Sequence, residues 1–107
     1  MNDSTKILNL LGLCQRSGNL VSGEFQTEKA VKEGRAVLVI IAADASGNTK
    51  KKFHDMCKFY RVKQIVLSDK EELGMKIGRS ERSNLAITDD GFAKAILREY
   101  EAYNARR

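Results

Sequence analysis

The side chains that could do covalent chemistry are few and scattered in this sequence. The single histidine, His54, falls one residue off the apolar stripe of its predicted helix, and no nucleophile motif accompanies it. We interpret it as a partly exposed surface residue. Asp89 and Asp90 form a carboxylate pair, but they stand where a helix N-cap is expected, and capping accounts for them without catalysis. We therefore predict no catalytic residue and no enzymatic activity.

The two cysteines, Cys14 and Cys57, have neither a CxxC motif nor the spacing of a metal site. Cys57 shares an apolar helical stripe with Phe53, Met56 and Tyr60. A free cysteine in such a stripe usually serves as a small buried apolar side chain. We predict no metal site and no cofactor.

One segment suited to a polyanion is the predicted helix start at residues 22–29. Its backbone amides and the positive end of the helix dipole favour a phosphate. Gln26 and Lys29 lie one turn apart on one face. Glutamine both donates and accepts hydrogen bonds, which suits reading the edges of bases, and lysine can bind purine acceptors or phosphate. An ordinary amphipathic helix with solvated polar residues accounts for the same pattern.

A second such segment is the run of Lys50, Lys51 and Lys52 in the first turn of another predicted helix. Three cations there oppose the helix dipole by about 0.3–1 kcal/mol each, and a bound polyanion would offset that cost. A solvated lysine face is the alternative, because such small terms are screened by salt. Residues 45–50 could also present backbone amides to a phosphate, but they match neither GxxxxGK[ST] nor GxGxxG.

Apolar periodicity alternates between helical and extended segments along the chain. The predicted helices run from Asp3 or Ser4 to near Gly18, over residues 23–33 with Ser22 as cap, around the stripe at residues 53–60, over residues 70–77, and from Asp89 or Asp90 toward Tyr103. The predicted strands cover residues 20–21, 37–42, 64–67 and 85–88, with a loop at residues 43–48. Strands that alternate with helices imply an α/β sandwich with helices on both faces of a central sheet.

Length and composition predict one folded domain over residues 1–107, with its core at about residues 5–100. The 107 residues are 42% hydrophobic and 31% charged, and they include no proline and no repeat or linker. No apolar run approaches the roughly 20 residues that span a bilayer, and the N-terminus lacks a signal-peptide pattern. We expect a cytoplasmic monomer without a membrane partner.

The chain carries a net charge of +5, and most of the excess lies in its first part. Residues 1–61 contain ten Lys and Arg against six Asp and Glu, whereas residues 62–107 contain nine against eight. A basic balance on a small domain favours a polyanionic partner such as a nucleic acid.

The middle of the chain adds a longer pattern. Residues 23–34 read GEFQTEKAVKEG and residues 38–44 read LVIIAAD; Leu73-Gly74, Gly78 and the segment 85–87 follow further on. This pattern resembles the kink-turn-binding ribosomal protein family, the group of the archaeal large-subunit protein L-seven-Ae and the eukaryotic L-thirty-e. Within that family the chain is most similar to the small bacterial YlxQ type. The resemblance covers roughly residues 5–100.

The resemblance implies a three-layer α/β/α sandwich around a mixed four-stranded sheet, and a partner that is structured RNA, either ribosomal RNA or another non-coding RNA, possibly on the ribosome. Members place the helix that begins at Gly23 in the widened groove beside tandem sheared G·A pairs, while loops hold an extruded base. By position, the RNA-binding residues would be Gly23, Phe25, Gln26, Lys29, Ser46, Lys50, Lys70, Arg82, Ser83 and Asn84.

The sequence departs from the family pattern at three places. Phe25 stands where the family usually has Asn, Gln26 stands where it usually has Glu, and the loop at residues 79–84 carries Glu81 and is more polar than expected. Gln26 still accepts hydrogen bonds. Phe25 either folds back onto Leu20 and Val21 as part of the core, or presents an exposed ring on which a base stacks. We favour the exposed ring, because the family keeps this position at the RNA surface.

The sequence thus predicts a protein that binds structured RNA, with kink-turn elements as the expected class. Two alternatives stay open. One is a protein-interaction or scaffold module on the same fold, whose RNA face has been lost at Phe25. The other is a small nucleotide-binding regulatory domain that uses residues 43–49.

Overall fold

The computed structural model describes residues 4–105. Five helices and four strands occur in this range: α1 (Thr5–Arg16), β1 (Leu20–Ser22), α2 (Glu24–Lys32), β2 (Leu38–Ile41), α3 (Gly47–Tyr60), β3 (Lys63–Val66), α4 (Lys70–Lys76), β4 (Asn84–Ile87) and α5 (Asp90–Ala105). Every element that the apolar periodicity predicts is present, in the predicted order.

The helix starts show which local signals decide the boundaries. Ser46 caps α3, since its Oγ accepts a hydrogen bond from the Thr49 backbone at 3.1 Å. The helix therefore begins at Gly47, inside the segment we predicted as a loop. Asp89 likewise accepts a hydrogen bond from the Phe92 backbone at 2.9 Å, which confirms its interpretation as a cap.

Two other predicted caps are not made. Ser22 is the last residue of β1, and the N-cap of α2 is Gly23, at φ 91° and ψ 155°, without a side-chain hydrogen bond. The prediction that Ser22 caps this helix was therefore wrong. At α1 the N-cap residue is Ser4, and its side chain makes no capping hydrogen bond. Asp3, the alternative cap, lies outside the described residues.

The four strands form one mixed sheet in the order β1-β4-β2-β3. β4 pairs antiparallel with both β1 and β2, and β2 pairs parallel with β3. Hence β1, β2 and β3 run in one direction and β4 runs in the other. The carboxyl ends of the first three strands and the start of β4 therefore meet at one end of the sheet, which we call the strand-end edge.

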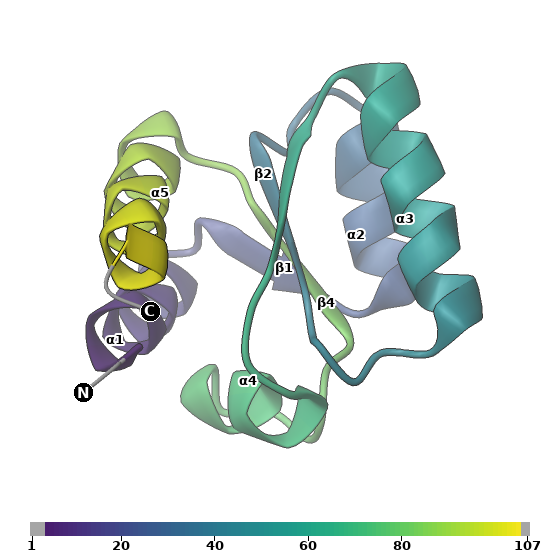
Figure 1. Cartoon of the computed structure of the whole chain (residues 1–107). Helices are drawn as coiled ribbons and strands as arrows, with labels where there is room; N and C mark the ends of the chain where they lie inside the picture. The colour runs from purple at the N-terminus through teal and green to yellow at the C-terminus, as the bar shows by residue number, and fades with distance from the viewer. Residues whose placement is uncertain (1–3, 106–107) are drawn as a thin grey trace.

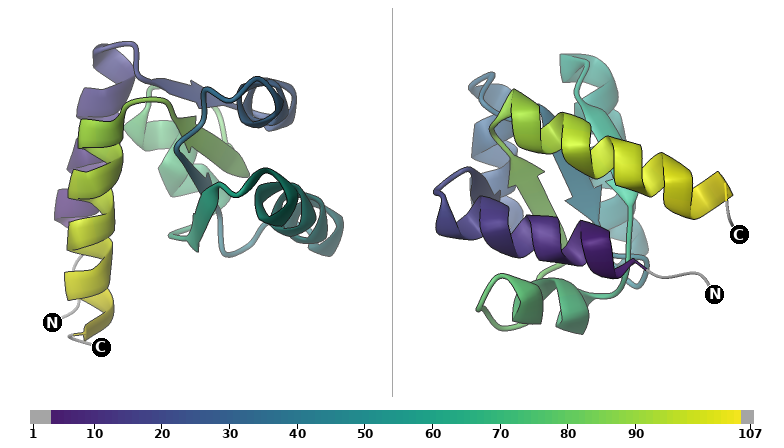
Figure 2. Two further views of the ribbon diagram at one scale, coloured as in Figure 1. Left: turned by 90° about the horizontal axis from the view of Figure 1, so that it is seen from above. Right: turned by 90° about the vertical axis from the view of Figure 1, so that its left-hand side faces the viewer.

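Helices cover both faces of this sheet. Figure 1 and the left view of Figure 2 show α1 and α5 on one face and α2 with α3 on the other, while α4 lies near the strand-end edge. The right view of Figure 2 shows α1 and α5 side by side. This arrangement confirms the predicted α/β/α sandwich around a mixed four-stranded sheet.

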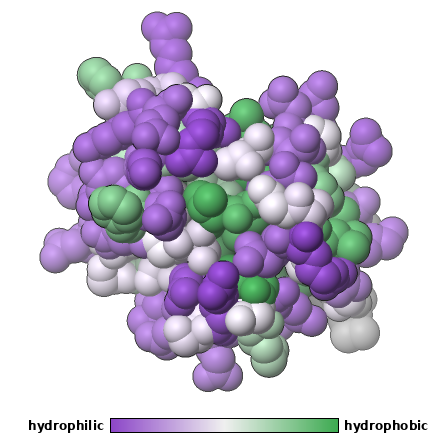
Figure 3. All heavy atoms as spheres, turned by 180° about the vertical axis from the view of Figure 1, so that it is seen from behind, coloured by the Kyte–Doolittle hydropathy of each residue, from purple (hydrophilic) through white to green (hydrophobic). Residues whose placement is uncertain are grey.

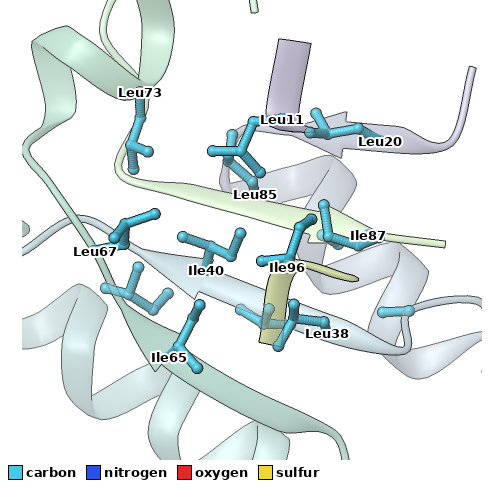
Figure 4. Packing of buried hydrophobic residues seen from close by; sticks show 14 of the residues in the cluster. Leu11, Leu20, Leu38, Ile40, Ile65, Leu67, Leu73, Leu85, Ile87 and Ile96 are labelled. Atoms are coloured by element: carbon cyan, nitrogen blue, oxygen red, sulfur yellow. The ribbon is translucent and has the colours of Figure 1, made fainter. Parts of the chain in front are cut away.

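Apolar side chains from every layer fill the interior. All four residues of β2 and all four of β4 are buried, as a strand covered on both faces requires. Figure 4 shows Leu11 of α1, Leu73 of α4 and Ile96 of α5 pointing toward strand side chains such as Ile40 and Leu85. This core holds the loops of the strand-end edge in place.

Candidate functional site

The topology brings most of the predicted site residues to the strand-end edge. Gly23 follows β1, Ser46 follows β2, Lys70 follows β3, and Ser83 and Asn84 lead into and begin β4. Backbone hydrogen bonds tie these segments together. Gly23 N–H donates to the Asn84 carbonyl at 3.2 Å, and Ala42 N–H donates to the Ser83 carbonyl at 2.9 Å. Segments far apart in the sequence therefore form one continuous surface.

Gly23 lies at a turn of this surface and has a positive φ. Its φ of 91° lies in a region that side-chain-bearing residues avoid, and a Cβ added here would meet nothing within 4 Å. The glycine is thus required by the backbone conformation alone. The open space above it lets another molecule approach the backbone closely.

Two shallow hollows flank this turn, and they share Ser22 and Arg82. One, of about 260 Å³, is lined by Ser22, Gly23, Glu24, Glu81, Arg82, Ser83 and Asn84. The other, of about 250 Å³, is lined by Gln15, Leu20, Val21, Ser22, Gln26, Arg79 and Arg82. Five of the predicted site residues line at least one hollow: Gly23, Gln26, Arg82, Ser83 and Asn84.

The outward face of α2, which we define as Phe25, Gln26 and Lys29, is exposed to solvent. Phe25 is 72% exposed, so it does not fold back into the core. Gln26 and Lys29 are also exposed, and neither makes a side-chain hydrogen bond or ion pair within residues 4–105. This face offers an aromatic ring, an amide and a cation to a partner.

Arg82 occupies the ridge between the two hollows. Its Nε donates to Ser22 Oγ at 3.0 Å, and one terminal nitrogen donates to Ser80 Oγ and to the carbonyl oxygens of Ser80 and Glu81. The guanidinium therefore fastens the loop at residues 79–83 to β1. It also leaves its second terminal nitrogen without a bond in the described structure.

Ser83 and Asn84 differ in accessibility. Ser83 is half-buried, whereas Asn84 is 1% exposed and already belongs to β4 rather than to the preceding loop. The Oδ1 of Asn84 is buried without a hydrogen-bond partner within residues 4–105, as is Oγ1 of Thr27 on α2. The amide of Asn84 thus forms part of the floor of one hollow.

Ser46, Lys50 and Lys70 lie beside the hollows without lining them. The hydroxyl of Ser46 is engaged in capping α3 and also bonds Thr49 Oγ1. The Lys70 backbone joins two neighbouring segments, since its N–H donates to Asp44 Oδ1 and its carbonyl accepts from Arg82 N–H. The ammonium groups of Lys50 and Lys70 have no ion pair in the described range.

The lysine run at residues 50–52 is not a uniform cationic face. Lys51 binds Asp55 at 2.8 Å, and Lys52 binds both Glu24 at 3.0 Å and Glu28 at 2.8 Å on α2. Hydrogen bonds from Lys32 and Lys52 lower the pKa of Glu28 to about 2. The protein's own carboxylates thus compensate two of these three cations, and a polyanion is not needed to explain them.

Two residues that the sequence did not single out also line a hollow. Gln15 comes from the last turn of α1, and Arg79 comes from the loop after α4. Nothing in the local pattern distinguishes either one, because their proximity to Gln26 arises only when α1 and α4 pack beside β1. Together with Arg82 they make this hollow rich in hydrogen-bond donors.

The histidine and the two cysteines, whose side chains could act as bases, nucleophiles or metal ligands, do not belong to this surface. His54 is exposed, as predicted. Cys14 and Cys57 are buried, and burial raises the pKa of these thiols to about 12 and about 11 respectively. Within residues 4–105, no three His, Cys, Asp or Glu side chains gather as metal ligands would. In the same range no helix has the length and apolarity that crossing a membrane demands.

Figure 3 shows the molecule from behind, the side toward which the β1 edge of the sheet lies. Polar side chains dominate this surface, while apolar ones form a group around its centre and appear singly toward its margins. An α/β/α sandwich that presents donors and an exposed aromatic ring at its strand ends has the features of a binding domain.

The chain belongs to the ribosomal protein L7Ae/L30e/S12e/Gadd45 family, whose family model matches residues 5–97. Within this family it is similar to the RNA-binding protein YlxQ of Bacillus subtilis, with 41% identity over 82% of this chain and 88% of that protein. It is also similar to the large ribosomal subunit protein eL8 of Thermoplasma volcanium, with 28% identity over 82% of this chain and 74% of that protein.

Solved structures agree with this membership. A protein of unknown function from Bacillus halodurans superimposes with a TM-score of 0.83 at 40% identity, covering 86% of this chain and 93% of its own. The 15.5kD RNA binding protein of Giardia lamblia superimposes with a TM-score of 0.75 at 25% identity, covering 95% of this chain and 88% of its own.

Proposed function

We propose that this protein binds structured RNA through the strand-end edge. The observation that carries the proposal is the outward face of α2, where Phe25, Gln26 and Lys29 are exposed and make no hydrogen bond or ion pair through their side chains within residues 4–105, beside a donor-rich hollow. Relatives with the same fold are named RNA-binding proteins, which supports RNA over other polyanions.

Each group on this face has a role in the proposed complex. Gly23 lets the RNA backbone approach, Gln26 donates to and accepts from base edges, and Lys29 binds a purine acceptor or a phosphate. Phe25 stacks on an unpaired base, which the Asn usual at this position in the family cannot do. Arg82 holds the loop that forms the far wall.

The proposed RNA class is the kink-turn, in ribosomal or other non-coding RNA of the cytoplasm. A kinked helix exposes a widened groove and an extruded base together, and the outward face of α2 and the adjoining hollows offer a matching pair of surfaces. The protein would act as a monomer, on the ribosome or in association with it, and without a cofactor.

A filter-binding assay tests the proposal. The protein is titrated with a kink-turn RNA, a plain RNA duplex of equal length and a DNA duplex, each at about 50 and about 200 mM salt. We expect the tightest binding for the kink-turn, and a loss of tens- to thousands-fold at the higher salt, because a handful of phosphate contacts release counterions. Equal affinity for all three nucleic acids, or affinity independent of salt, would contradict the proposal.

A further inference from the structure

Besides Phe25 on α2, two further aromatic side chains are exposed at the C-terminal end of α3. Phe59 is 77% exposed and Tyr60 is 40% exposed, and their rings pack edge to face with centroids 4.9 Å apart at 75°. In Figure 1, α3 starts at the strand-end edge and carries these residues to the opposite end of the molecule. Two adjacent large apolar rings left in solvent are typical of an interaction surface.

The charged residues between positions 56 and 68 are all cations. Lys58, Arg61 and Lys63 are exposed and make no ion pair within residues 4–105, and residues 56–68 include no Asp or Glu. Cations at a helix C-terminus are favourable in themselves, which accounts for Lys58 and Arg61. That effect does not account for the exposed rings, nor for Lys63 on the neighbouring strand. We call these five residues, 58–61 and 63, the α3 terminal patch.

Two neighbouring carboxylates are ion-paired with lysines outside the patch, although Asp55 also interacts electrostatically with Lys58. Asp55, one turn before Phe59 on α3, is bound to Lys51 at 2.8 Å, and Glu28 on α2 is bound to both Lys32 and Lys52. The cations of the patch are therefore available to an anionic partner.

A hollow of about 290 Å³ adjoins the patch between α3 and β3. It is lined by His54, Cys57, Lys58, Val62, Lys63 and Gln64. The side-chain Oε1 of Gln64 is buried there without a hydrogen-bond partner in the described range. The lysines that line the hollow, Lys58 and Lys63, are exposed and can meet a phosphate.

We propose that the α3 terminal patch binds unpaired nucleotides of the same RNA that the strand-end edge holds. Aromatic rings set among cations form the usual platform for single-stranded nucleic acid, because every base has a face that can stack. α3 has 14 residues, so at 1.5 Å per residue it extends about 20 Å from the strand-end edge to the patch, a length that a short single strand covers. The proposal rests on the proposed function and adds a second contact to it.

The test compares a kink-turn RNA with the same RNA extended by about ten unpaired nucleotides, at its 5′ end in one version and at its 3′ end in another. Wild-type protein should bind one extended RNA about tenfold more tightly than the unextended one. Phe59→Ala should remove that gain and leave the affinity for the unextended RNA unchanged. Met75→Ala is the control, because Met75 is another largely exposed apolar residue, on α4, and its loss should change neither affinity.

The outcomes separate the two proposals. Two results would overturn the proposal for the patch and leave the strand-end site unaffected. One is tight binding of the kink-turn with no gain in affinity from either extension, which is also the result expected if the patch binds a protein. The other is a gain in affinity that persists in Phe59→Ala. Failure to bind the kink-turn would overturn the proposed function. In that case, a free ten-nucleotide strand that binds wild type but not Phe59→Ala would still support the patch, and no binding of that strand would end both proposals.

Discussion

The outward face of α2 and the lysine run at residues 50–52 of α3 both carry cations, but their intramolecular contacts differ. At α3, two of three consecutive lysines are bound to carboxylates of the protein itself. At α2, Gln26 and Lys29 have no such partners among residues 4–105, and Phe25 is open to solvent. The absence of intramolecular partners, rather than the density of positive charge, is thus what distinguishes the proposed RNA face on α2 from the lysine run on α3.

The first residues of α2 and α3 also differ in whether the protein itself satisfies their polar groups. α3 begins with a serine whose hydroxyl satisfies a backbone amide, whereas α2 begins with Gly23 and no side-chain cap. The α3 start is arranged for local stability, and the α2 start leaves its first amides open. An uncapped helix start is less stable, but it can offer those amides to a ligand.

Gly23→Val should produce the largest loss of stability. The φ of 91° and ψ of 155° are essentially restricted to glycine, so a branched side chain should lower the free energy of unfolding by about 3 kcal/mol. Ser46→Ala, which removes only the cap of α3, should cost about 1 kcal/mol. Urea denaturation of both variants measures this difference. A smaller loss at Gly23 than at Ser46 would show that the turn before α2 is not constrained as described.

Lys29→Ala and Lys51→Ala form a matched pair of lysine substitutions for RNA binding. Lys29 is unpaired on the outward face of α2, so its loss should weaken kink-turn binding by about 2 kcal/mol, and more than it weakens plain duplex if Lys29 contacts a base. Lys51 is bound to Asp55, and its loss should change affinity by less than about 0.5 kcal/mol. Isothermal titration at one salt concentration compares them. The same loss in both variants would mean that only overall charge matters.

Phe25→Ala should weaken RNA binding by about 1.5 kcal/mol through lost stacking and change the unfolding free energy by less than about 0.5 kcal/mol, because the ring is 72% exposed. Phe25→Asn should restore base-edge pairing and sharpen the preference for tandem G·A pairs. Melting temperature and kink-turn affinity of both variants check this. Unchanged RNA affinity in both would remove Phe25 from the site.

The smallest effect should come from the ion pairs between α2 and α3. The pKa of Glu28 is lowered from 4.5 to about 2, so its charged form stabilises the fold fully above pH 4.5, and that contribution is lost as the pH falls toward 2. Glu28→Gln should lower stability at neutral pH by less than about 1 kcal/mol and remove this part of the acid dependence. Denaturation curves between pH 2 and 7 measure it, with Glu71→Gln, on an exposed carboxylate of α4, as the control. An unchanged acid profile for Glu28→Gln would show that the pairs do not persist in solution.

The fold could be predicted from the sequence because its signals are local. The apolar run at residues 37–42 and the helical stripe from Phe53 to Cys57 each mark an element without reference to the rest of the chain. The errors lie at the ends of elements. Ser46 starts α3 earlier than expected, and Ser22 extends β1, because pairing with Leu85 overrides its preference for a helix cap.

The site could be predicted only in part, because its contacts are distant in the sequence. Lys52 meets Glu24 across 28 positions, and Arg82 meets Ser22 across 60. No local pattern indicates that Lys52 is paired with a carboxylate or that Arg82 fastens a loop to β1. Asn84 was expected in an exposed loop, yet it opens β4 and is buried, since the strand begins one residue earlier than its apolar run.

Hydrogen–deuterium exchange with and without a kink-turn RNA tests the central claim most directly, because it maps the bound surface along the whole chain. The account predicts RNA-dependent protection at residues 22–29 and 79–84 and weaker protection at residues 44–50. It predicts no protection on α5, and none on α1 except in its last turn, which contains Gln15. Protection confined to α1 and α5, or protection in the first turns of α3 without any at the start of α2, would contradict it.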